Sequence, residues 1–134
     1  MSRLDEKLGA VGFDNLINGL YPPAEVFSVQ IRKETAAATI YKRGTVLALS
    51  GGTAGDGTFV ILGSTAIADE TLAANCVLAE DIEVGTSDNA TAIAYRSGHF
   101  NANNLTVAEG YTMKATDKEA LRTAGILLSD AVEV

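Results

Sequence analysis

The chain has few residues that could carry out chemistry, and their spacing matches no catalytic pattern. His99 is the single histidine and Cys76 the single cysteine. A nucleophile–base pair or a triad would have to use His99, yet no spacing typical of such a site accompanies it. We interpret His99 as a surface or turn histidine and Cys76 as a small buried thiol. The sequence predicts no catalytic centre, and one histidine excludes a histidine-rich metal site.

Two acidic segments resemble ligand-binding sites only in part. The glycines of residues 51–57 could cradle a phosphate, but neither a Lys-Ser/Thr pair nor a helical pattern follows them. Asp56 lies between two glycines, but the alternating oxygen ligands of a calcium loop are missing. Asp81 and Glu83 would share one strand face, where a solvated edge is favoured over a paired acid and base. We therefore expect a hairpin loop at residues 51–57, no bound metal and no cofactor.

The tripeptide Arg96-Ser97-Gly98 is similar to one found in trimeric dUTP pyrophosphatases, which also have a small β-rich fold. Those enzymes need further motifs, including an aspartate-bearing Gly-Val/Tyr-Asp segment placed for catalysis. The chain contains no such segment. A dUTP pyrophosphatase-like enzyme therefore stays an alternative that rests on three residues.

Composition favours a protein partner over nucleic acid or membrane. The 134 residues fit one domain, and apolar residues make up 47% of them against 20% charged ones. A small chain with so large a share of apolar residues is expected to expose an apolar surface to a partner. The net charge of −7 and the absence of Trp argue against binding a phosphate backbone or stacking bases. No apolar stretch approaches the roughly 18 residues of a membrane span, and no secretory signal is visible, so we expect synthesis in a host cytoplasm.

Alternating apolar residues predict that most of the chain forms short strands. The clearest alternation runs from Val26 to Lys33, with Phe27, Val29 and Ile31 on one face. Residues 66–74 fit either a loop or a short helix. The other predicted strands lie at residues 40–41, 45–49 (after a bend at Arg43-Gly44), 58–62, 76–84, 91–95 and 126–134, with Thr91, Ile93 and Tyr95 on one face.

One short helix is predicted near the C-terminal side. Thr116 and Glu119 fit a capping box, in which each side chain bonds a backbone N–H at the helix start. Leu121 lies in a short apolar stripe, and Gly125 suits the left-handed helix exit. Many short strands, one helix and no alternation of strands with helices predict a mostly-β fold with a minor α part.

The N-terminal residues are expected to form an arm. Apolar residues occur there at helical spacing, but Gly9, Gly12 and Gly19 each weaken a helix by about 1 kcal/mol relative to Ala. Pro22-Pro23 stops any helix and forces an extended path. We therefore expect a partly ordered arm at residues 1–24 and a single β-rich domain at residues 25–134.

Several segments follow one another in an order that is similar to one protein family. They are Asp14-Asn15-Leu16-Ile17 with Gly19 and Pro22, Lys42-Arg43-Gly44-Thr45-Val46-Leu47, Tyr95-Arg96-Ser97-Gly98-His99-Phe100-Asn101, Asp117-Lys118-Glu119-Ala120-Leu121-Arg122 and Ala124-Gly125-Ile126. Over roughly residues 13–134 this order resembles the lambda-type head decoration proteins of tailed phages, the capsid cement protein D family. The N-terminal side is longer here than the short arm of the lambda protein.

The resemblance implies a trimeric cement protein with a β-clip-like small barrel or sandwich. Such trimers bind the major capsid protein on the outer surface of the expanded head, at three-fold and local three-fold positions. They hold the shell of the virion against the pressure of packaged DNA, and their N-terminal arms order on contact and can add a strand to a capsid sheet. The residues expected to contact the capsid are Leu16, Ile17, Tyr21, Phe27, Val29 and Ile31.

Other interpretations of these segments stay open. The strand at residues 26–33 could be a core strand of the domain or could pair within the trimer, and residues 4–20 could dock on the folded body. The main alternative function is a generic β-rich oligomeric interaction module of a virion or tail.

Overall fold

The computed structural model describes residues 16–19 and 22–129. Its elements, in chain order, are β1 (Ile17–Gly19), β2 (Glu25–Ile31), β3 (Thr39–Tyr41), β4 (Val46–Gly51), β5 (Phe59–Ile61), β6 (Thr71–Leu78), β7 (Ile82–Val84), β8 (Ala90–Asn101), the 3-10 helix η2 (Ala102–Asn104), α2 (Ala115–Ala124) and β9 (Ile126–Ser129).

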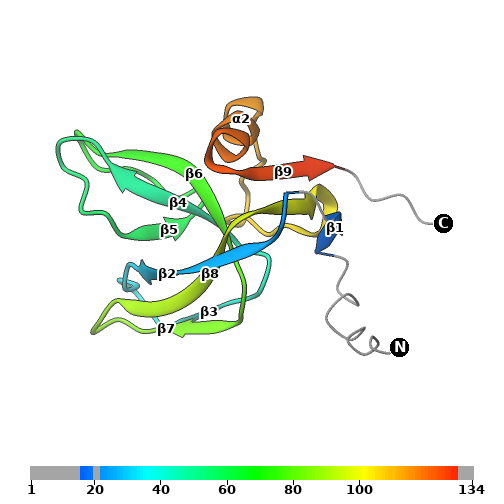
Figure 1. Ribbon diagram of the computed structural model, residues 1–134. Coiled ribbons are helices and arrows are strands. Elements are labelled where there is room, and N and C mark those ends of the chain that lie inside the picture. The colour runs from blue at the N-terminus through cyan, green and yellow to red at the C-terminus, as the bar shows by residue number, and fades with distance from the viewer. Residues whose placement is uncertain (1–15, 20–21, 130–134) are drawn as a thin grey trace.

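Five strands close into a small barrel in the order β8, β2, β5, β4, β6, and β6 pairs again with β8 (Figure 1). The neighbours are antiparallel except β2 and β5, which pair in parallel only where Ile31 meets Phe59. The strands β3 and β7 form a separate two-stranded sheet. The predicted mostly-β barrel with one short helix near the C-terminal side is confirmed.

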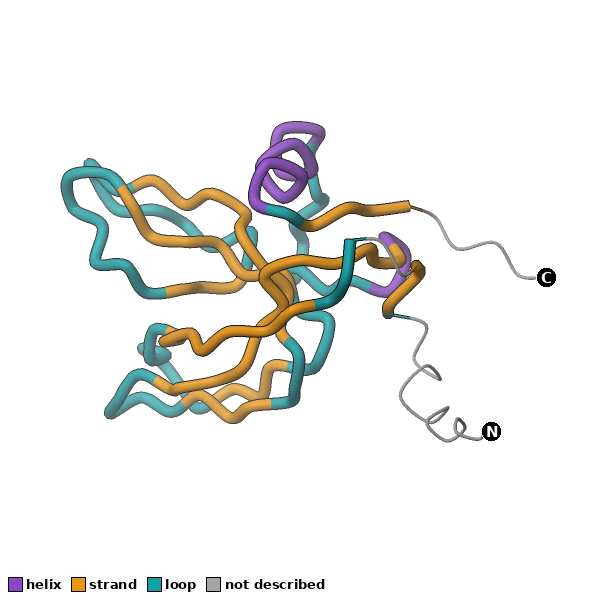
Figure 2. Tube along the Cα trace, in the orientation of Figure 1, coloured by secondary structure: helices purple, strands orange, loops and turns teal. Residues whose placement is uncertain are grey.

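Strand β8 continues past the barrel and builds a second, smaller sheet. From Gly98 onward it pairs parallel with β9 and antiparallel with β1, in the order β1-β8-β9. We call these three strands the end sheet; they lie together at the end of the molecule where the described chain begins and ends (Figure 2). Gly98 has φ 147°, and a Cβ there would lie 2.7 Å from the Phe100 ring. A glycine is therefore needed where β8 leaves the barrel.

The barrel interior is filled by alternate residues of its strands. The face predicted for Phe27, Val29 and Ile31 is confirmed, and it points inward: Val29 and Ile31 are fully buried. Strand β2 is therefore a core strand, one of the interpretations left open above. On β8 it is Ala92 and Ala94 that point inward. The shared face of Thr91, Ile93 and Tyr95 is the outer one, because a narrow barrel accepts the small alanines inside.

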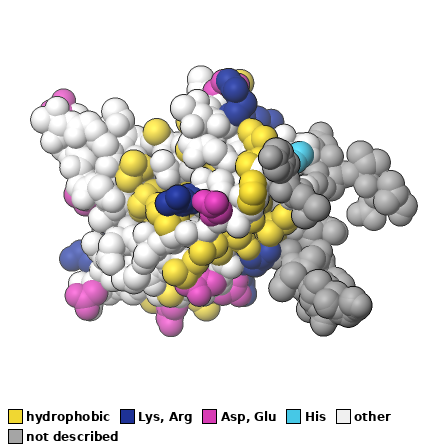
Figure 3. All heavy atoms as spheres, viewed as in Figure 1, with side chains coloured by type: hydrophobic (Ala, Val, Ile, Leu, Met, Phe, Trp, Pro, Cys, Tyr) yellow, Lys and Arg dark blue, Asp and Glu magenta, His cyan; other side chains and the backbone are white. Residues whose placement is uncertain are grey.

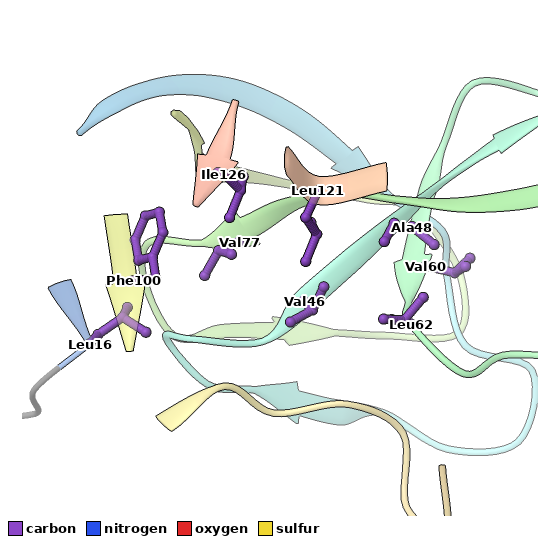
Figure 4. Packing of buried hydrophobic residues seen from close by; sticks show 10 residues of the cluster. Leu16, Val46, Ala48, Val60, Leu62, Val77, Phe100, Leu121 and Ile126 are labelled. Carbon is purple, nitrogen blue, oxygen red and sulfur yellow. The ribbon is translucent and has the colours of Figure 1, made fainter. Parts of the chain in front are cut away.

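A second apolar cluster lies outside the barrel, between β4, β6 and the elements of the C-terminal side. Leu121 of α2 points toward Val46 of β4, and Ile126 points toward Val77 of β6 (Figure 4). Phe100 of β8 and Leu16, which precedes β1, complete this cluster and are also fully buried. Burial of each such side chain contributes roughly 1.5–3 kcal/mol. This cluster fixes α2 and the end sheet to the barrel.

The helix exists as predicted, but its start differs. It begins at Ala115, and the N–H of Lys114 donates to Asp117 Oδ2 at 3.0 Å. The capping position is therefore Lys114 and not Thr116. The Asp117 carboxylate, three residues after Lys114, accepts this N–H and stabilises the positive helix start. Glu119 instead pairs with Arg122 at 2.7 Å. The predicted exit at Gly125 is confirmed, with φ 113°.

The predicted strand at residues 76–84 is two strands. The chain turns at residues 79–81 between β6 and β7, because Asp81 accepts a hydrogen bond from the Arg43 N–H at 2.7 Å and Gly44 donates to the Leu78 carbonyl. The bend predicted at Arg43-Gly44 is confirmed by the φ of 98° at Gly44. The ambiguous residues 66–74 are a loop followed by the start of β6.

Changing Gly125→Val should destabilise the fold by roughly 2 kcal/mol or more, because a β-branched residue is strained at positive φ and its Cβ would lie 2.9 Å from the Arg96 carbonyl oxygen. Thermal melting measures this. Gly85→Ala is the control, since nothing lies within 4 Å of a Cβ there. An unchanged Tm for Gly125→Val would contradict the helix exit described here.

Candidate functional site

The two residues with the most reactive side chains lie in different sheets. Cys76 is fully buried, and burial raises the pKa of its thiol to about 12, so the thiol stays neutral. His99 lies in the end sheet, where its Nε2 is 2.8 Å from the Ser129 hydroxyl. Within residues 16–19 and 22–129, no group of three His, Cys, Asp or Glu side chains is placed to hold a metal.

In the loop between β4 and β5, the acidic side chain of Asp56 bonds to other groups of the protein. Asp56 accepts hydrogen bonds from the Thr58 N–H at 3.0 Å, from the Thr58 hydroxyl at 2.6 Å and from Arg32 at 3.2 Å. These hydrogen bonds, those from Thr58 first, hold the pKa of Asp56 well below its usual range. Asp56 therefore shapes the hairpin loop predicted at residues 51–57.

A buried polar cluster that sequence reasoning missed lies beside this loop. The Glu70 side chain is 1% exposed and accepts hydrogen bonds from the Ser50 hydroxyl, from Arg32 at 2.6 Å and from the Ile67 N–H at 3.1 Å. The Ser50 and Arg32 bonds lower the pKa of Glu70 to about 2. The cluster joins the end of β2 to β4 and to the loop before β6. Nothing in the local pattern of residues 66–74 indicated it.

The tripeptide Arg96-Ser97-Gly98 also has partners within the chain. The Ser97 hydroxyl donates to the Pro23 carbonyl at 2.8 Å, and Arg96 lies 3.6 Å from the Glu25 carboxylate. These contacts hold the segment before β2 against the bend of β8. Asp81 lies in the turn before β7, so it does not share a strand with Glu83 as predicted.

The expected contact residues have different surroundings. Leu16, Val29 and Ile31 are core residues with 0–3% exposure, so their side chains offer no surface in this fold. Ile17 on β1 is 38% exposed. Phe27 is half-buried, with its ring 6.2 Å from that of Phe59. Tyr21 lies outside the described residues.

The exposed aliphatic side chains mark a different surface, the outer face of β2 and β8. Val26 is 53% exposed and Ile93 38%. Because Ser28 pairs with Ile93, Val26 and Ile93 are diagonal neighbours across the two strands. Figure 3 shows a band of hydrophobic side chains crossing this side of the molecule. We call Val26 and Ile93 with their surroundings the outer β2–β8 face; sequence reasoning placed Ile93 on an apolar strand face but did not single out Val26.

The end sheet offers a second kind of surface. Among the described strands, β1 and β9 each pair with β8 only, so each has an edge with no strand on it. Such an edge presents unpaired N–H and C=O groups to a partner strand.

No helix in the described part of the chain has the length and apolar character needed to cross a membrane.

Glu70→Gln should lower Tm at pH 7 and weaken the pH dependence of stability. The pKa of Glu70 is lowered from 4.5 to about 2, so its charge stabilises the fold above pH 4.5 and this stabilisation is lost as pH falls toward 2. Melting curves at pH 7, 4.5, 3 and 2 should show the wild type and the variant converging. Glu119→Gln, in an exposed pair, is the control and should change Tm little. A constant difference between wild type and Glu70→Gln at all four pH values would contradict the role of the cluster.

Comparison with known proteins gives one family. The family model described as bacteriophage lambda head decoration protein D matches residues 29–127, which begin within β2 and end within β9. No curated protein matches the chain significantly.

Proposed function

Since the chain belongs to the family of the bacteriophage lambda head decoration protein D, we propose that it binds the outer surface of the expanded phage head as a trimer and stabilises that shell against packaged DNA. The observation that carries the proposal is the match over residues 29–127, which includes four of the five barrel strands in full, the last part of β2 and part of the end sheet. The major capsid protein is then the partner, at three-fold and local three-fold positions of the virion. The sequence resemblance and the family match agree on this class of protein.

The end sheet is the surface that we assign to the capsid. Its outer strands have edges without a strand neighbour in the described chain, and Ile17 is exposed on β1. An extended segment can add to such an edge, so that main-chain hydrogen bonds give affinity and side chains give specificity. Residues 1–15 precede Leu16 in the chain and are the arm of this proposal. The core residues Leu16, Val29 and Ile31 support the contact by fixing β1 and β2.

The outer β2–β8 face is the surface that we assign to neighbouring copies. Val26 and Ile93 would lose exposed apolar area there, which favours association. Arg96 and Glu25, both about 60% exposed, lie beside these residues and can exchange partners between copies. Three linked capsid contacts then bind far more tightly than one, because each later contact is intramolecular.

The enzyme alternative has less support. In a dUTP pyrophosphatase-like site Arg96 and Ser97 would serve a nucleotide. Here Arg96 forms an ion pair with Glu25, and the Ser97 hydroxyl donates to the Pro23 carbonyl. Release of pyrophosphate from dUTP by the pure protein would favour that alternative. A generic virion or tail module differs in its partner, and would bind other structural proteins of the particle in preference to the head shell.

Purified protein should bind saturably to expanded shells that lack decoration, and bound protein should raise the temperature at which the shells break open. Co-sedimentation and light scattering measure these. Light scattering of the bound or concentrated protein should give a mass three times the 13.9 kDa of one chain. Shells before expansion are the control, and equal binding to both forms, or a monomer on the shell, would contradict the proposal.

Deleting residues 1–15 should weaken binding to expanded shells and leave the Tm of the domain unchanged, because all core residues from Leu16 onward are kept. The matched control deletes residues 1–19, which also removes Leu16 and β1 and should lower Tm as well. Unchanged affinity after deletion of residues 1–15 would refute the role of the arm.

A further inference from the structure

A groove lies between α2 and β9 at the end sheet, and the function proposed above does not yet use it. Its volume is about 440 Å³, and its lining includes His99, Lys118, Arg122, Leu127 and Leu128. We propose that this groove binds an extended, acidic segment of the major capsid protein, which pairs with the edge of β9. The inference rests on the proposed function.

The floor of the groove is apolar, and one of its side chains does not pack in either apolar cluster of the fold. Leu128 packs against the cluster outside the barrel, whereas Leu127 belongs to neither apolar cluster although it is half-buried. Leu127 lies opposite His99 in the parallel pairing of β8 and β9. An apolar side chain of a bound segment would cover Leu127 and remove its surface from water.

The backbone of β9, a strand that lines the groove, offers hydrogen bonds at its edge away from β8. The Gly98 N–H donates to the Gly125 carbonyl at 3.2 Å, so the residues that turn their backbone groups toward β8 are Gly125 and then Leu127. The groups of the intervening residues Ile126 and Leu128 point to the opposite edge. Ile126 is fully buried, which leaves the accessible part of this edge at Leu128. The groove therefore fits an extended chain.

The rim of the groove is basic although the whole chain carries a net charge of −7. Lys118 and Arg122 are four residues apart on α2 and so lie on the same side of the helix. Glu119 pairs with Arg122, which leaves one positive charge in excess at the rim. In Figure 3 basic side chains lie above the hydrophobic side chains at this end, with the histidine beside them. This charge favours a segment that carries Asp or Glu.

The groove is continuous with the surface assigned to the capsid. A Cβ on Gly19 of β1 would lie 2.7 Å from His99 Nδ1, and His99 Nε2 reaches Ser129 of β9. His99 thus contacts both outer strands of the end sheet. A capsid segment in the groove would lie next to a contact at β1, whereas a second copy has its own surface on the outer β2–β8 face.

The test uses the full chain and expanded shells that lack decoration. Leu127→Glu should weaken binding to the shells about tenfold, since it removes an apolar contact and adds a charge of the same sign as the segment. The double variant K118E/R122E should also weaken binding by about tenfold and flatten its salt dependence. Matched controls are Ile40→Glu on the edge strand β3, where Ile40 is 59% exposed, and Lys42→Glu; both should bind as the wild type does.

Hydrogen exchange of the wild-type protein gives a second readout that does not depend on a variant. Amides of residues 126–129 should exchange more slowly on shells, while those of residues 39–41 stay unchanged. Wild-type-like binding of Leu127→Glu, or no protection of β9, would overturn the inference and leave the proposed function intact. Protection of β9 in the concentrated free protein would also overturn it, in favour of a second copy. Wild-type protein that fails to bind shells would overturn both.

Discussion

The structure depends on one strand that serves two sheets. Strand β8 pairs with β2 and β6 to close the barrel, then bends at Gly98 and pairs with β1 and β9. The bend places Phe100 in the cluster that holds α2 against the barrel. A larger residue at Gly98 would meet the Phe100 ring, so the barrel and the end sheet are joined by a conformation that glycine alone allows without strain.

This arrangement separates the surfaces that partners can use. The polar groups near the loops, such as Glu70 and Asp56, are bonded to other groups of the chain and stabilise its connections. The outer β2–β8 face exposes the aliphatic side chains of Val26 and Ile93, and the end sheet has strand edges and a groove beside α2. The proposed decoration trimer would use the first surface for its own copies and the second for the shell.

Much of the fold was predictable because its signals are local. The alternation at Phe27, Val29 and Ile31 gave the strand and its inner face, and Gly125 gave the helix exit. The environment of that face was not predictable, because whether it contacts a partner or the barrel interior depends on strands far away in the chain. The same holds for Ile93, which lies outside because Ala92 and Ala94 fit the narrow barrel. Glu70 was missed because its partners Arg32 and Ser50 are 38 and 20 residues away.

The central claim is that the chain decorates the phage head with its end sheet against the shell. An electron cryo-microscopy reconstruction of expanded shells saturated with the protein tests it most directly. The account predicts three copies around each three-fold position, with β1 and β9 next to the major capsid protein and the outer β2–β8 faces toward one another. Density with the β3–β7 sheet or the loop of residues 51–57 against the shell would contradict it.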